Sequence, residues 1–186
     1  SQHLEAAIRQ ASQNGATALI FDIRGIESDN VTVIGNMLDI LLGKMTTIYQ
    51  EDASGISQEL MSSDESEVEL PMVVLTDNTT AGTTELFAQA LRDTGKARTV
   101  GETTFGKGTQ QSFYNLKNGS AIYLTVARYA GPSGETYDQV GVPADYEVAY
   151  PAEMDKTATM GDPEYDSQLR RAMEIASAAV KTDSEG

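Results

Sequence analysis

The sequence predicts an α/β fold in which at least part of the sheet is parallel. Three observations carry this prediction: short apolar runs typical of buried strands, amphipathic segments of helical period, and their alternation through the first hundred residues. The 186 residues suffice for one domain with a hydrophobic core. Neither an internal repeat nor a boundary between two domains is visible.

Helix and strand alternate from the start of the chain. Apolar side chains recur at helical spacing in residues 4–11 and 33–42, and a glycine follows each segment as a helix stop. Between them, residues 16–23 form an apolar run that predicts a strand buried on both faces. The polar residues 24–30 are expected to form a loop, and residues 45–50 a strand.

Residues 51–69 have a different composition. Their acidic, serine-rich stretch Ser62-Ser63-Asp64-Glu65-Ser66-Glu67 predicts a solvated loop insertion. A flexible flap or docking segment is the functional alternative, and an exposed loop is the simpler interpretation.

The second half of the chain continues the pattern. Residues 72–75 predict a buried strand, residues 86–91 a helix, and residues 98–101 a short strand. Residues 111–129 predict a hairpin whose turn is Lys-Asn-Gly at 117–119.

The end of the chain is less regular. Residues 131–163 are rich in Gly, Pro and Tyr and are expected to form an irregular rim, and residues 165–176 have a helical apolar period. We therefore assign residues 1–180 to one core domain and residues 181–186 to a polar, disordered tail.

Composition excludes several classes of function. The net charge of −15 argues against a nucleic-acid partner, because phosphate binding needs a basic face. There is no cysteine, so disulfides, thiolate catalysis and zinc–thiolate sites are excluded. The single histidine, His3, lies at the N-terminus and predicts neither a Ser-His-Asp triad nor a multi-histidine metal site. No cofactor is expected, and no apolar run reaches the ~20 residues of a membrane span.

The turn at residues 77–84 has the strongest chemical pattern. It follows a buried strand and opens a helix, so position 82 lies where backbone N–H groups and the helix dipole favour negative charge. Lys107 follows position 82 by 25 residues, and Gln111 follows Lys107 by four. A lysine can act as a general base for a nucleophile if burial lowers its pKa.

This ordered set of motifs resembles the C-terminal processing peptidases of family S41, serine peptidases that use a Ser–Lys pair. The family's turn resembles Ser-Ala-Ser-Ala-Ser-Glu, with the middle serine as nucleophile, and the matching tripeptide here is Ala81-Gly82-Thr83. Further matches lie at residues 95–108, 118–129, 132–134 and 140–145. The resemblance covers roughly residues 4–177.

The resemblance implies a ClpP/crotonase-like core, a mixed sheet with packed helices. It implies Lys107 as general base and Gln111 as the residue that orients it, with a polypeptide as substrate or ligand. Family members are usually exported, so an extracytoplasmic location is expected. Most carry a PDZ domain before this core, which we expect N-terminal to Ser1 in a longer parent protein.

Two departures from the family pattern predict degenerate or absent proteolysis. Gly82 occupies the nucleophile position and has no side chain. The family's Gly-Asn-Pro-Gly-Gly loop, whose backbone helps to form the oxyanion hole, here reads Gly-Ile-Glu-Ser-Asp, and its carboxylates oppose an oxyanion. Two altered parts of one mechanism favour natural degeneration over a deliberate knock-out. The resemblance places this oxyanion region at Gly25, Ser28, Asp29 and Thr83.

Simpler interpretations remain for each residue. Gly82 is also suited to a helix N-cap with Glu85 as its capping-box partner, and Lys107 or Gln111 to an exposed surface. The leading hypothesis is a peptidase-like domain that has lost activity and retains polypeptide binding. One alternative is an active serine-type or threonine-type peptidase with a rearranged site, although the hydroxyl of Thr80 or Thr83 is expected to miss the lysine. Another is a non-catalytic scaffold module of an exported protein.

Overall fold

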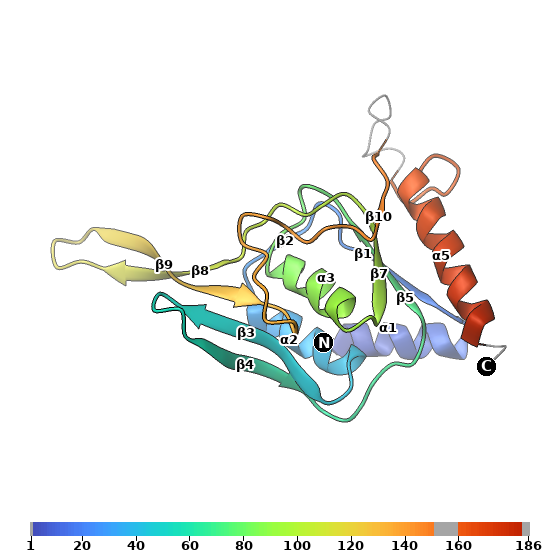
Figure 1. The fold of residues 1–186 in the computed structure, drawn as a ribbon, viewed down its shortest axis with the longest axis horizontal. Helices are drawn as coiled ribbons and strands as arrows, with labels where there is room; N and C mark the ends of the chain where they lie inside the picture. The colour runs from blue at the N-terminus through green and yellow to red at the C-terminus, as the bar shows by residue number, and fades with distance from the viewer. Residues whose placement is uncertain (1, 151–159, 184–186) are drawn as a thin grey trace.

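The computed structural model describes residues 2–150 and 160–183 of the chain (Figure 1). Its helices and strands, in chain order, are α1 (Gln2–Gln13), β1 (Leu19–Asp22), β2 (Glu27–Ser28), α2 (Val31–Leu41), β3 (Met45–Asp52), β4 (Ser57–Ser63), β5 (Met72–Thr76), β6 (Ala81–Gly82), α3 (Thr83–Asp93), β7 (Ala97–Gly101), β8 (Thr109–Asn115), β9 (Ala121–Ala130), β10 (Tyr146–Glu147) and α5 (Ser167–Asp183). The predicted α/β class is confirmed.

Four parallel strands form the central sheet in the order β1-β5-β7-β10. Strand β5 pairs with β1 and β7, and all five of its residues are buried, as its apolar run predicts. Because parallel strands end at the same edge of a sheet, the turns after β1 and β5 meet there. Those two turns are residues 24–30 and 77–82 of the chain.

Helices cover both faces of the central sheet. Leu38 of α2 and Phe87 of α3 pack with Val74 in the larger core. Ala172 of α5 packs with Val73 on the opposite face, as the alternation of side chains along a strand requires (Figure 1). The sheet is therefore the middle layer of the domain. None of the helices in the described residues is long and apolar enough to cross a membrane.

A second, antiparallel sheet has the order β4-β3-β9-β8. Its strands β8 and β9 form the predicted hairpin, which extends well beyond the rest of the molecule (Figure 1). Strand β3 pairs with β9 only at residues 127–130, so the distal part of the hairpin is a two-stranded ribbon. We call residues 109–130 the β8–β9 arm.

Three local predictions need correction. The predicted loop at 51–69 contains β4, an edge strand whose mostly exposed side chains give it a polar sequence while its backbone pairs with β3. The predicted loop at 24–30 contains the short strand β2. Helix α5 continues through Asp183 into the predicted tail, and residues 184–186 lie outside the described residues. In the predicted rim, the described residues hold only the two-residue strand β10, and residues 151–159 are likewise outside.

Candidate active site

Asp77 ties the two turns at the carboxyl edge of the sheet together. Its buried carboxylate oxygen Oδ1 accepts hydrogen bonds from the backbone N–H groups of Thr79 (3.0 Å) and Thr80 (2.9 Å) in its own turn. The same oxygen accepts one from Gly25 N–H (3.1 Å) in the turn after β1. The Gly25 amide, predicted to belong to the oxyanion region, therefore donates to a carboxylate.

Gly82 lies at the start of α3 in a conformation that favours glycine. Its φ is +72°, and a Cβ atom built on it would overlap the carbonyl oxygen of Ser28. This close approach arises because β2 and β6 pair in parallel with Ser28 opposite Gly82. The backbone of Ser28 fills the space into which a side chain at position 82 would extend.

The predicted oxyanion region consequently presents an acceptor beside position 82. The Ser28 carbonyl oxygen accepts a hydrogen bond from the Thr83 hydroxyl at 3.0 Å. Asn30 N–H donates to the Ser28 hydroxyl at 3.1 Å. A carbonyl oxygen and the neighbouring Asp29 carboxylate repel an oxyanion, whereas oxyanion holes offer N–H donors.

Neither threonine of the rearranged-site alternative has its hydroxyl on the lysine. Thr83 donates to the Ser28 carbonyl, and Thr80 is buried with its hydroxyl 3.1 Å from the Ile23 carbonyl oxygen. The two hydroxyls therefore bond to backbone carbonyl groups, and the rearranged-site alternative stays a prediction.

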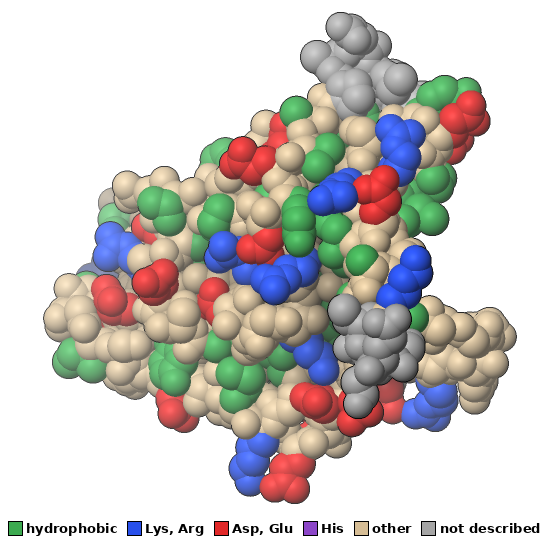
Figure 2. Space-filling view, turned by 45° about the vertical axis from the view of Figure 1, so that its right-hand side comes forward, with side chains coloured by type: hydrophobic (Ala, Val, Ile, Leu, Met, Phe, Trp, Pro, Cys, Tyr) green, Lys and Arg blue, Asp and Glu red, His purple; other side chains and the backbone are tan. Residues whose placement is uncertain are grey.

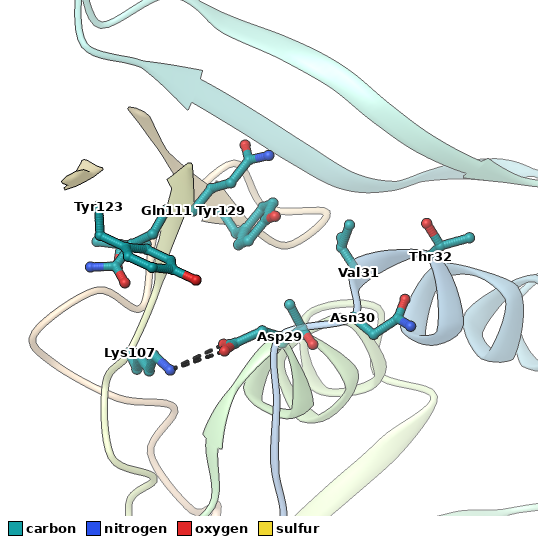
Figure 3. A pocket seen from close by; sticks show the side chains of 11 residues that line it. Asp29, Asn30, Val31, Thr32, Lys107, Gln111, Tyr123 and Tyr129 are labelled. Atoms are coloured by element: carbon teal, nitrogen blue, oxygen red, sulfur yellow. Dashed lines mark hydrogen bonds and ion pairs between the residues drawn. The ribbon is translucent and has the colours of Figure 1, made fainter. Parts of the chain in front are cut away.

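Lys107 lines a pocket and contacts the turn after β1 on the same side of it (Figure 3). Its ammonium lies 2.8 Å from the Glu27 carboxylate and 3.1 Å from Asp29 Oδ1. Hydrogen bonds to Glu27 and then to Asp29 raise the pKa of Lys107 above its ordinary value, outweighing the lowering by partial burial. A general base requires the opposite direction of shift. The side chain is 30% exposed, so it lies at the pocket and is not deeply buried.

Gln111 lines the same pocket as Lys107. The hydrogen bonds of the Lys107 ammonium go to Glu27 and Asp29. The orienting role predicted for Gln111 stays a prediction.

Glu85 is the buried centre of the site, and sequence reasoning recognised it only as a capping residue. Its carboxylate is fully buried and accepts hydrogen bonds from the backbone N–H groups of Gly82 (3.0 Å), Gly106 (2.7 Å) and Lys107 (2.8 Å). It also accepts one from the Thr104 hydroxyl. The predicted contact with Gly82 is confirmed. Since one carboxylate bonds to both backbones, Glu85 links Gly82 and Lys107.

Tyr137 closes the site from the irregular segment after the arm. Its buried hydroxyl donates to the Gly82 carbonyl oxygen at 3.0 Å. Burial, reinforced by the charge of Glu85, raises the pKa of Tyr137 far above its ordinary value, so it remains a neutral donor. Its distance along the chain from Gly82, 55 residues, left no local pattern from which to predict the contact.

The pocket has a volume of about 520 Å³. Figure 3 shows Asp29 and Lys107 on one side, with Tyr123, Tyr129 and Gln111 of the β8–β9 arm opposite. Its position at the carboxyl edge of the sheet is the usual place for a ligand site in an α/β fold.

The α/β core has counterparts among proteases of known structure. The photosystem II D1 C-terminal processing protease matches it with a TM-score of 0.72 and 31% sequence identity. That match covers 81% of this chain and 41% of the other. A sequence profile of peptidase family S41 matches residues 1–148. The chain belongs to peptidase family S41.

Similar proteins of known name support the membership in family S41. The carboxyl-terminal-processing protease of Synechocystis sp. is 32% identical over 145 residues, which cover 78% of this chain and 34% of that protein. Carboxyl-terminal-processing peptidase 3 of Arabidopsis thaliana is 35% identical, covering 76% and 28%. CtpA of Bacillus subtilis is 31% identical, covering 87% and 36%. The chain thus spans about a third of the length of these relatives.

Proposed function

We propose that this S41 domain binds polypeptide segments in its pocket and does not hydrolyse them. The observation that carries the proposal is the position of the Ser28 carbonyl oxygen against Gly82. A nucleophile is absent from position 82, and the space for one is filled. Both features oppose acyl transfer at this position.

The state of Lys107 supports the same proposal. With its pKa raised by Glu27 and Asp29, Lys107 remains an ammonium at neutral pH and has no lone pair to accept a proton. Through its ion pairs, the ammonium connects the segment before β8 with the turn after β1. The pocket is therefore present, but in this proposal it holds no general base.

Polypeptide binding is supported by the open surface of the β8–β9 arm beside the pocket. Phe113 and Tyr123 form an edge-to-face pair and are 53% and 66% exposed. Tyr114 and Leu124 are also exposed on the ribbon. Exposed apolar side chains next to a pocket mark surfaces that bind other molecules.

Family membership leads to two further proposals about the parent protein. We propose that it acts outside the cytoplasm and that a PDZ domain precedes Ser1. We propose no cofactor for the function of this domain.

The test measures cleavage and binding on one preparation. A fluorescein-labelled unfolded casein should remain intact over hours with the wild-type chain, and its anisotropy should rise to saturation. Clear turnover that Lys107→Ala abolishes would establish the active-peptidase alternative. Neither cleavage nor saturable binding would leave the scaffold module as the better description.

A further inference from the structure

We propose that the pocket beside Lys107 receives the guanidinium group of an arginine side chain in the bound polypeptide. This inference rests on the proposed polypeptide binding and adds the chemistry by which a segment is chosen. Three features of the pocket support this proposal: its negative charge, its aromatic side chains and one acceptor that has no hydrogen-bond partner among the described residues.

The charges around the pocket leave one negative charge uncompensated. Glu27 and Asp29 both contact the single ammonium of Lys107. Their side chains are 61% and 73% exposed, so a cation arriving from solvent can reach them. A carboxylate has about four acceptor positions, and Lys107 takes one on each oxygen of Asp29. The net charge of −15 attracts cationic segments at long range.

Two tyrosines of β9 face Asp29 from the other side of the pocket (Figure 3). Tyr123 is 66% exposed, whereas Tyr129 is almost fully buried. Burial raises the pKa of Tyr129, and the charge of Asp29 raises it further, so the field of Asp29 extends across the pocket. A guanidinium stacks on aromatic faces while it donates to a carboxylate.

Gln110 supplies an unsatisfied acceptor. Gln110 is among the residues that line the pocket, and its side-chain oxygen is buried and accepts no hydrogen bond from any of the described residues. Leaving such an atom unsatisfied costs about 1–3 kcal/mol. A guanidinium carries five N–H donors in a planar fork and can donate to more than one acceptor while its face stacks on an aromatic ring, whereas an ammonium has three donors around one atom. The pocket therefore favours arginine over lysine.

The test compares three fluorescein-labelled heptapeptides that differ only at the central residue: arginine, citrulline or glutamate. Citrulline keeps the shape of arginine and removes the charge. At low salt the arginine peptide should bind at least about tenfold more tightly than the citrulline peptide, and added salt should reduce the difference.

Variants locate the effect. Asp29→Asn should reduce the arginine preference to about threefold or less, and Tyr123→Ala should weaken the arginine peptide more than the citrulline peptide. Glu147→Gln removes the same unit of charge from exposed β10 and should leave the preference unchanged.

Equal affinity for arginine and citrulline, or equal loss in Asp29→Asn and Glu147→Gln, would overturn this inference while leaving polypeptide binding in place. If no heptapeptide binds but unfolded casein does, the arginine pocket is wrong and the proposed function stands. If casein also fails to bind, both are wrong.

Discussion

The substitution Gly82→Ser restores the residue that the S41 pattern has at this position, and we expect it to destabilise the domain without restoring cleavage. Glycine is required there for two reasons, the φ of +72° and the overlap of any Cβ atom with the Ser28 carbonyl oxygen. Asp29 Oδ1 would also lie 3.2 Å from the new Cβ. The β2–β6 pair must open before a side chain fits.

The magnitude follows from these terms. A non-glycine residue held in such a backbone region costs about 1–3 kcal/mol. Each lost backbone hydrogen bond of the β2–β6 pair adds about 1 kcal/mol. We expect a loss of about 3 kcal/mol, which in a domain of this size lowers Tm by roughly 6–12 °C.

Gly55→Ser is the matched control. Gly55 has a φ of +76° in the turn between β3 and β4, and a Cβ built there meets no heavy atom within 4 Å. It therefore isolates backbone strain, about 1 kcal/mol. Urea unfolding followed by far-ultraviolet circular dichroism would give both values. Equal losses in the two variants, or Lys107-dependent casein cleavage by Gly82→Ser, would refute the argument from Ser28.

Three further predictions concern the charged groups. Asp29→Asn should lower the pKa of Lys107, because one of the two carboxylate partners of the ammonium is removed. NMR titration of methylated lysines measures this pKa. An unchanged pKa would mean that Lys107 and Asp29 are not in contact in solution. Asp166→Asn should cost about 3 kcal/mol at neutral pH by weakening the pairing of buried Arg24. Burial alone would raise the pKa of Asp166 in the folded state, but hydrogen bonds to Arg24 and to backbone N–H groups lower it below the ordinary 3.8. The ionised carboxylate therefore stabilises the fold above pH 3.8, and this stabilisation is lost as the pH falls through the folded-state pKa. Wild type should consequently lose more unfolding free energy in acid than the variant, and parallel urea curves would contradict this. Glu85→Gln should cost about 2 kcal/mol, since an amide N–H would face backbone N–H donors; a loss similar to that of an exposed Glu→Gln change would contradict its role.

The α/β class was predictable from the sequence because burial leaves periodic patterns. The apolar run of β5 and the hairpin turn at 117–119 identified their elements from local residues alone. Strand β4 was missed because an exposed edge strand is held by its backbone, and its side chains carry no signal of burial.

The site was only partly predictable from sequence. The spacing of 25 residues predicted that Lys107 belongs to the same site as Gly82, but its ion partners come from the turn 78 and 80 residues earlier and had no signal in the sequence. The register that sets Ser28 against Gly82 depends on how two turns meet at the sheet edge. The sequence pattern indicated Glu85 as a helix-capping residue. Its additional contacts with Thr104 and Gly106 depend on tertiary structure and leave no local pattern.

The pairing of β2 with β6 also bears on how such a site evolves. A serine at position 82 fits only at a cost in stability, because its Cβ atom would overlap the Ser28 carbonyl oxygen until the β2–β6 pair opens. A substitution at position 82 and a shift of the Ser28 backbone therefore depend on each other, so a chain that changes position 82 alone would be less stable.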